Sequence, residues 1–405
     1  MVTPPTITVA GARLDPRRVG TPVQITLGRS TPNVQPDPPA AVFQWLGAEP
    51  PFNLGDSVLI EASIGGSDDV PSWADPAYAW DDPGAVWGEA ALEPVPRFTG
   101  TVETIDVALD VGELDVWAVG CLGTSATVAR QPVRLERQRE TDFERVAAIA
   151  ADAGITVAIR GTETVHLIPD NIRRNALSAL HEIAASSGAI VWEDPDGTII
   201  YGARDYRVAL TAKVWLTPSE VLHGLNYTRN TVDVTNDITI GYGTGNASNT
   251  YRDTDSIAAW GLRATDIDTL LDDEVDADAL GTTILGRRRN PRWALDTVAV
   301  DSSTLTPPNR RELMRVTLGQ PISLPIAHDP DGPRDPTLWA VEGWAEVWDH
   351  ANGPLEQALA IYCTHRDLWG DALLRTYAEL AEQTYAHWAL GTYFDALIRE
   401  IGYAT

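Results

Sequence analysis

Residues 97–109, Arg-Phe-Thr-Gly-Thr-Val-Glu-Thr-Ile-Asp-Val-Ala-Leu, alternate apolar and polar side chains at a period of about two residues. Such alternation is typical of a β-strand with one buried face. The apolar phase slips between Val102 and Ile105, and a bulge with one extra residue would explain the slip. Because bulges are common where a sheet curls, this stretch predicts a barrel-like sheet.

The flanking sequence extends the same pattern in both directions. Residues 23–27 and 58–64 alternate upstream, and residues 114–118 open another strand downstream. Period-two patterning over these lengths indicates half-buried strands. We therefore expect a first β-barrel-like domain over residues 1–134.

A long aperiodic stretch, residues 70–96, interrupts this region with prolines and acidic residues. Loops of this length are uncommon inside compact domains and are often functional. Tryptophan is favoured as an anchor in protein interfaces, so we interpret the stretch as an interface loop. Its candidate contact residues are Trp73, Tyr78, Trp80 and Trp87. Packing of these aromatic residues on their own barrel and a sugar-binding site are the alternatives.

The pattern then changes to helical. Residues 141–144, Thr-Asp-Phe-Glu, have the spacing of a capping box, and Gly154 is a natural stop for the helix that follows. A second helix is expected over residues 175–187. Residues 190–201 read as a hairpin that turns at Asp-Pro-Asp-Gly. Residues 135–205 therefore predict a small α+β domain with helix-strand-helix-hairpin order.

Strands resume after this domain, and a second β-barrel-like domain with a helical insert is expected over residues 206–365. The insert helix is expected at about residues 275–289. Simple alternation along the late strand puts Trp339 and Val341 on one face and Trp344 and Trp348 on the other. Both faces of that strand would then be partly apolar, as in a strand packed on two sides.

The last segment, residues 366–405, carries an eight-residue repeat of hydroxyl-aromatic pairs. Acidic residues three places further on resemble repeated capping boxes, so a helical segment is expected. We interpret it as a docking tail for another subunit or protein, with a helix that covers its own barrel as the alternative. The candidate docking residues are Trp369, Tyr377, Tyr385, Trp388 and Tyr393.

Composition excludes several functional classes. The 405 residues include 57 acidic and 30 basic side chains, which gives a formal net charge of −27. This charge argues against duplex nucleic acid and against an anionic membrane surface, because both require basic surfaces. No run of about 18 apolar residues is present, and the N-terminal residues lack the pattern of a secretory signal. Cys121 and Cys363 are expected to be reduced core residues on strands.

Catalytic motifs are missing as well. The sequence contains no HExxH, GxSxG, phosphate-cradling loop or dinucleotide fingerprint, and its seven histidines are scattered. We therefore expect no enzyme activity, no catalytic residue, no metal site and no cofactor. The acidic pairs are interpreted as solvated loops; they are Asp68-Asp69, Asp81-Asp82 and Asp272-Asp273-Glu274.

Three parts of the sequence together resemble a known family. They are residues 97–102 with the exit at 128–133; the block 142–197; and residues 251–261 with Arg289-Asn290-Pro291 and Val341-Glu342-Gly343. These patterns resemble the minor tail proteins of long-tailed phages of actinobacteria. Those proteins are similar in turn to the hub proteins of the tail tip or baseplate.

The resemblance implies a mainly β fold of two β-barrel-like hub domains with α+β inserts. It implies a homotrimer whose six barrels form a pseudo-sixfold ring that joins the sixfold tail tube to the threefold tip. The implied neighbours are the distal tail ring protein, the tape-measure protein and downstream tip or fibre proteins. DNA would pass through the lumen without specific binding, and no stable membrane insertion is implied.

The implied location is the virion tail tip, after assembly in the cytoplasm of the host bacterium. Two other functions remain as alternatives at this point. A receptor- or carbohydrate-binding tail protein would expose Trp73, Trp80 and Trp87 on the virion. A cell-wall hydrolase would need two facing carboxylates in a cleft.

Overall fold

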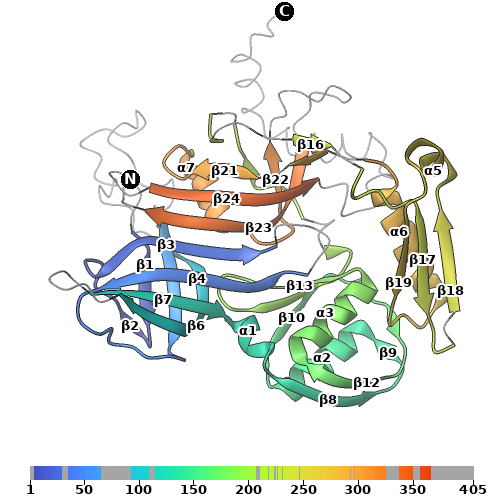
Figure 1. Cartoon of the computed structure of the whole chain (residues 1–405), viewed down its shortest axis with the longest axis horizontal. Coiled ribbons are helices and arrows are strands. Elements are labelled where there is room, and N and C mark those ends of the chain that lie inside the picture. The colour runs from blue at the N-terminus through green and yellow to red at the C-terminus, as the bar shows by residue number, and fades with distance from the viewer. Residues whose placement is uncertain are drawn as a thin grey trace, which may run out of the picture.

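The computed structural model shows a β-rich molecule with a helical domain below a large sheet and a smaller lobe at one side (Figure 1). The structure describes residues 4–29, 35–64, 93–108, 115–206, 210–217, 219–222, 225, 227–229, 231–245, 247–291, 293–295, 297–324, 337–349 and 356–365. Among these residues, no helix is long and apolar enough to cross a membrane.

A twelve-stranded sheet forms the main body. Its strands are β1 (Thr6–Val9), β2 (Ala12–Arg13), β3 (Val19–Gly28), β4 (Asp37–Leu46), β5 (Ser57–Ile64), β6 (Glu93–Ala108), β7 (Val116–Gly123), β15 (Val214–Trp215), β21 (Val298–Asp301), β22 (Pro321–Leu324), β23 (Thr337–Asp349) and β24 (Glu356–His365). Along its main path the order is β15-β22-β23-β3-β4-β7-β6-β5-β1-β2, and β24 pairs with both β23 and β21. The fold is therefore mainly β, as predicted.

The expected bulge is present in β6. Its register against β7 shifts between Val102 and Thr104, where the apolar phase of the sequence slips. Phe98 and Val102 both point into the core because the strand alternates regularly before the shift. The slip in the sequence therefore marked a real irregularity of the sheet.

Strand β23 differs from the prediction in the face on which its tryptophans lie. Its register against β24 shifts between Val341 and Gly343, so Glu342 is an extra residue. The shift brings Trp344 and Trp348 onto the same buried face as Trp339, with each side chain only 1% exposed. Simple alternation had placed them on opposite faces, because it cannot detect an inserted residue.

The sheet crosses the border between the two ranges predicted as separate barrels. Strand β3 pairs antiparallel with β23, from Gly28 opposite Gly343 to Val23 opposite Trp348. A Cβ atom on Gly28 would lie 2.4 Å from the carbonyl oxygen of Glu342, and one on Gly343 would lie 2.4 Å from that of Leu27. Only glycine permits so close an approach of the two strands. The division into residues 1–134, 135–205, 206–365 and 366–405 stays a prediction.

The helical domain follows the predicted order. It contains α2 (Asp142–Ala153), α3 (Ala176–Ser187) and a sheet of β10 (Val157–Arg160), β14 (Ile199–Gly202) and β13 (Ile190–Glu193). The capping box is present at Thr141 and Glu144, and Gly154 ends α2 in the left-handed conformation. Two-stranded ribbons complete the domain: β8 (Pro132–Arg137) with β12 (Asp170–Asn175), and β9 (Glu140–Thr141) with β11 (His166–Leu167).

A lobe at the right of Figure 1 is formed by β18 (Ala247–Arg252), β17 (Asp237–Tyr242) and β19 (Ala264–Asp268), with α5 (Thr254–Trp260) and α6 (Glu274–Arg288). Helix α6 is the predicted insert helix. The remaining elements are α1 (Thr124–Val128), α7 (Pro307–Met314), β16 (Tyr227–Arg229) and β20 (Trp293–Leu295).

Two hydrophobic cores hold the described residues together. One lies in the large sheet and includes the three tryptophans of β23. The other fills the helical domain and extends to β17 and α6 of the lobe. Both cysteines are buried and unpaired, Cys121 on β7 and Cys363 on β24, as predicted. Burial raises the pKa of the Cys121 thiol to about 12, so it stays protonated and unreactive at neutral pH.

Candidate functional site

The contact of the early strands β3 and β6 with the late strand β23, here called the joint, carries a fully buried ion pair. Arg97 on β6 donates from Nε to Oε2 of Glu346 on β23 at 2.8 Å, and both side chains are 0% exposed. The guanidinium also donates to the Met314 carbonyl and lies over the Trp344 ring, 5.1 Å from its centroid. Gln357 donates to the other oxygen of Glu346. The charges are thus compensated by several partners at once.

A second buried pair lies nearby on the same two parts of the chain. Arg29, which follows β3, donates from Nε to Oε2 of Glu342 at 2.7 Å, and Thr364 donates to Oε1. Glu342 lies opposite Arg29 because Gly343 pairs with Gly28 in the register of β23 against β3, and the Arg29 N–H donates to the Glu342 carbonyl at 2.9 Å. In both pairs the arginine comes from the first 97 residues and the glutamate from β23. The two ion pairs therefore help to hold β23 against the early part of the chain.

The hairpin of the helical domain is fixed to the large sheet by another carboxylate. Glu193 accepts hydrogen bonds from the backbone N–H groups of Thr124, at 2.8 Å, and Ser125, at 2.7 Å. It thereby caps the N-terminus of α1, which has no cap of its own. A Cβ atom on Gly123 would lie 2.7 Å from this carboxylate, so glycine leaves room for it. Burial raises the pKa of Glu193, opposed by these N–H donors.

A chain of buried hydroxyl groups inside the helical domain has the residue types of a hydrolase. The Tyr201 hydroxyl donates to Asp142 at 2.7 Å and lies 2.7 Å from the Ser187 hydroxyl. Asp142 also accepts from Thr164 and from the backbone of Val165. Asp142 is 1% exposed and Tyr201 is 0% exposed, so substrate has no access to the chain. It holds α2, α3 and β14 together.

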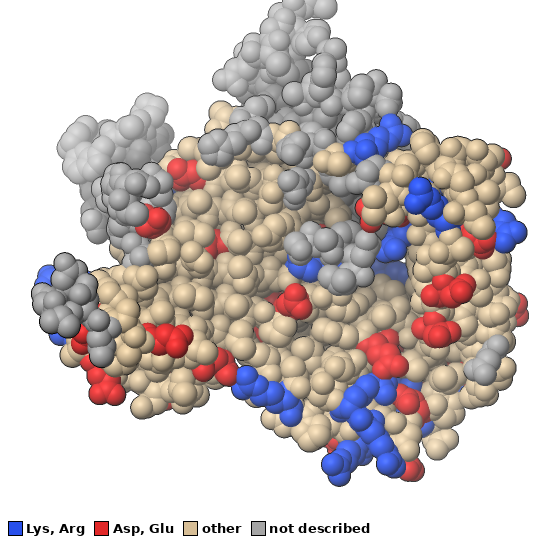
Figure 2. Space-filling model, viewed as in Figure 1, with Lys and Arg blue, Asp and Glu red and all other residues tan. Residues whose placement is uncertain are grey.

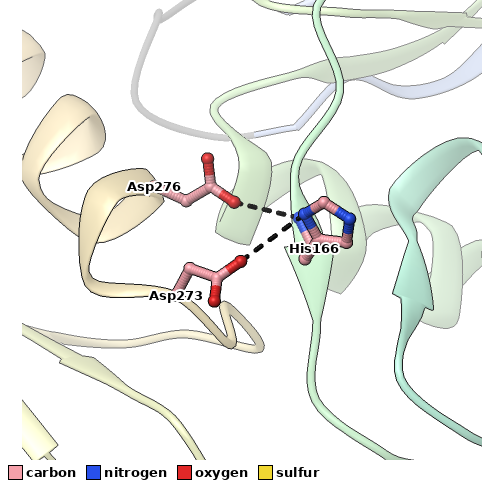
Figure 3. Close-up of side chains that lie close together, drawn as sticks. All are labelled: His166, Asp273 and Asp276. Atoms are coloured by element: carbon pink, nitrogen blue, oxygen red, sulfur yellow. Dashed lines mark hydrogen bonds and ion pairs between the residues drawn. The ribbon is translucent and has the colours of Figure 1, made fainter.

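Figure 3 shows the group of side chains that most resembles a metal site. One ligand atom each from His166, Asp273 and Asp276 lies within 4.8 Å of the others. The two carboxylates already accept hydrogen bonds from protein donors. Asp276 accepts from the His166 backbone N–H at 3.0 Å, and Asp273 pairs with Arg139 at 2.9 Å and with His166 at 3.5 Å.

This group lies where the lobe meets the helical domain. Arg139 also pairs with Asp272, and the backbones of His166 and Asp272 are hydrogen-bonded at 2.9 Å. Asp272 and Asp273, which were expected in a solvated loop, are half-buried and connect the lobe to Arg139 of the helical domain. The loop was predicted, but its ion pairs with Arg139, which lies 133 positions before Asp272, were not.

A groove of about 790 Å³ lies on the outer face of the β8–β12 ribbon. It is lined by Arg130, Pro132, Val133, Arg134, Leu135, Glu136, Asn171, Arg173, Arg174 and Asn175. Figure 2 shows basic side chains gathered at this lower end of the molecule. Such local basic character stands out in a chain whose net charge is −27.

The residues predicted as interface contacts lie outside the described residues. This applies to Trp73, Tyr78, Trp80 and Trp87 and to Trp369, Tyr377, Tyr385, Trp388 and Tyr393. Sequence reasoning missed the buried pairs and the arginine-lined groove. Glu342 and Glu346 did carry a signal, because acidic residues in an otherwise apolar strand need buried partners.

The solved structures whose fold resembles that of this chain include phage tail proteins. A tail protein from Neisseria meningitidis MC58 matches with a TM-score of 0.60 and 14% identity, over 90% of this chain and 97% of that chain. The 43 kDa tail protein of prophage MuSo2 from Shewanella oneidensis matches with a TM-score of 0.59 and 12% identity, over 90% and 98%. Both matches span nearly the whole of each chain.

A third similar structure is the prophage tail protein gp18 from Listeria monocytogenes EGD-e. It has a TM-score of 0.52 and 10% identity, over 94% of this chain and 99% of that chain. No protein-family model and no curated protein matches the sequence. At these identities the likeness is one of fold.

Proposed function

We propose that this chain is a non-enzymatic structural protein of a phage tail. The observation that carries the proposal is the match of fold with tail proteins over at least 90% of the chain. The polar clusters described above support it, because their charges and hydroxyl groups are engaged in holding segments together. The carboxylates at the joint, Glu342 and Glu346, are each paired with a buried arginine.

Within the tail, we place the chain at the tip as a hub. In this proposal three copies form a ring between the sixfold tube and the threefold tip, with the distal tail ring protein, the tape-measure protein and tip or fibre proteins as neighbours. The continuous sheet through β3 and β23 supports a mechanical role, because it joins an early and a late segment of the chain by backbone hydrogen bonds. The minor tail proteins of actinobacterial phages are the proposed relatives.

The first test measures mass and position. Light scattering of the purified protein, alone and with its tail neighbours, should give about three times the chain mass of 43.9 kDa. Gold-labelled antibodies should bind the tail tip in electron micrographs of phage particles, and a label against the tube protein gives the control position. Labelling along the whole tube, or none on the particle, would contradict the hub.

A further inference from the structure

Two arginines on the groove face each other, and among the described residues neither guanidinium group forms an ion pair. Arg134 on β8 lies directly opposite Arg173 on β12. The Ala176 N–H bonds to the Gln131 carbonyl, and the Arg134 N–H bonds to Asp152 instead of across the ribbon. This pattern makes Arg134 and Arg173 a non-hydrogen-bonded pair, the type whose side chains approach most closely. Like charges in that arrangement destabilise a ribbon.

The neighbouring arginines of the groove are neutralised, unlike these two. Arg130 pairs with Glu103 at 2.8 Å, and Arg174 pairs with Asp170 at 3.0 Å. In the described part of the chain no carboxylate pairs with Arg134 or with Arg173, whose Nε donates only to the Asn171 amide oxygen, at 3.1 Å. Both side chains belong to exposed residues. The ribbon thus presents two adjacent guanidinium groups that can each accept a carboxylate.

The lobe presents the matching negative surface. Asp266 and Asp268 are exposed on β19, an edge strand of the lobe's sheet. They share one face because they are two residues apart, whereas Ile267 between them lies opposite Ile240, which is buried against α6. Across the described residues, neither aspartate forms an ion pair with an arginine or with Lys213. The face therefore has two carboxylates that no described basic side chain neutralises.

The spacing of the two surfaces is compatible. Cβ atoms of a close cross-strand pair lie about 4.5–5.5 Å apart, and residues two apart on a strand lie about 6.8 Å apart. Arginine side chains are long enough to accommodate a difference of this size. In one molecule the ribbon lies at the bottom of Figure 1 and β19 lies in the lobe at the right, so the two surfaces belong to different parts of the chain.

We propose that Arg134 and Arg173 of one copy dock onto Asp266 and Asp268 of a second copy of this chain. The contact is head-to-tail, because two different surfaces meet, and repeating it generates a ring if the rotation closes. This interface rests on the proposed function, in which the chain forms a homo-oligomer, and it identifies the two surfaces that would meet in that oligomer. Nucleic acid fits the ribbon less well, since two free arginines form too short a basic track beside a net charge of −27.

Charge reversal tests the contact. Two double variants, R134D/R173D and D266R/D268R, each put like charges across the interface, and the quadruple variant R134D/R173D/D266R/D268R restores opposite charges. We expect each double variant to weaken self-association by about tenfold or more, and the quadruple variant to recover the wild-type mass. The control R13D/R17D makes the same charge change at exposed positions far from the groove. It should leave the mass unchanged.

Sedimentation velocity at matched ionic strength reads out the mass, and circular dichroism confirms that each variant is folded. Double variants that keep the wild-type oligomer would overturn this interface and leave the hub proposal standing. A quadruple variant that stays dissociated would also overturn it. If the wild-type chain is monomeric at every concentration, this interface is wrong, and antibody labelling of the tail tip then decides the hub proposal separately.

Discussion

At the residue scale, the most informative side chains are the charged ones in the core. Arg97 and Glu346 are fully buried and far apart in sequence, and each has further hydrogen-bond partners. A buried pair of this kind contributes little compared with an apolar pair of the same shape, but losing one partner leaves an uncompensated charge. Such a pair therefore dictates which segments meet.

Arg97→Met should lower the free energy of unfolding by about 3–5 kcal/mol, because it strands the Glu346 carboxylate in the core. The paired variant Arg97→Met/Glu346→Leu should recover much of that loss. Urea unfolding followed by tryptophan fluorescence measures both, since Trp344 lies beside Arg97. A loss below about 1 kcal/mol for the single variant would show that water reaches the pair.

Asp194 is expected to make the chain more stable in mild acid. Burial raises its pKa from 3.8 to about 6, against the indole N–H of Trp192 that donates to it. Between these values the folded chain holds a proton that the unfolded chain has released. The stability from this group is therefore complete below about pH 4 and is lost as the pH rises through 6.

Asp194→Asn removes this titration. Relative to the wild type, the variant should gain stability between pH 4 and pH 7 by at most about 3 kcal/mol, the value of a shift of about two pKa units. Unfolding midpoints measured at several pH values give the difference. If the two profiles run parallel over this range, Asp194 is not the group responsible.

At the scale of elements, two glycines with similar φ angles allow the cost of backbone strain to be distinguished from the cost of a close contact between strands. Gly28 ends β3 with φ +85° and touches the backbone of β23, whereas Gly11 has φ +78° and no atom within 4 Å of the place that a Cβ atom would occupy. Alanine is strained in both conformations, but only at position 28 does it also push two strands apart. The pair therefore isolates the contribution of close strand contact.

Gly11→Ala should cost about 1–2 kcal/mol, the ordinary penalty of the left-handed region. Gly28→Ala should cost a further 1–3 kcal/mol or so, because its methyl group would meet the Glu342 carbonyl. Thermal unfolding of both variants beside the wild type gives the two values. Equal losses would mean that β3 and β23 separate easily, contrary to the ion-paired joint.

The sequence predicted well those elements whose contacts join residues only a few positions apart. The capping box at Thr141, the end of α2 at Gly154 and the hairpin through residues 194–197 depend on contacts within a few positions, and all are present. The bulge at Glu342 was not predictable, because only the pairing of β23 with β24 shows it. The position of Arg134 opposite Arg173 likewise depends on the register of β8 against β12, which cannot be predicted from the sequence alone.

At the scale of the whole molecule, the lobe is joined to the helical domain by a shared hydrophobic core and a small set of polar contacts. Arg139 pairs with Asp272 and Asp273 just before α6, and Leu167 forms a single bridge with Leu271. Leu271 also belongs to the core shared with the helical domain. The lobe is thus held by an apolar centre with an ionic rim.

Arg139→Ala should loosen the lobe without unfolding the chain, because the apolar centre remains. Hydrogen exchange should quicken at residues 270–278 and change little in the large sheet. Arg130→Ala removes a comparable exposed ion pair with Glu103 and serves as the control. Faster exchange across the large sheet in the Arg139 variant would instead mean that lobe and sheet unfold together.

The pairing of β3 with β23 has a consequence for biosynthesis. Arg29 and Glu342 are 313 positions apart, so at about 5–20 residues per second roughly 15–60 seconds pass before the ribosome supplies the partner strand. During that interval one side of β3 is an open edge that another nascent chain could pair with. High contact order of this kind slows folding. Production of the protein should therefore benefit from slow expression at low temperature, which keeps half-made chains apart.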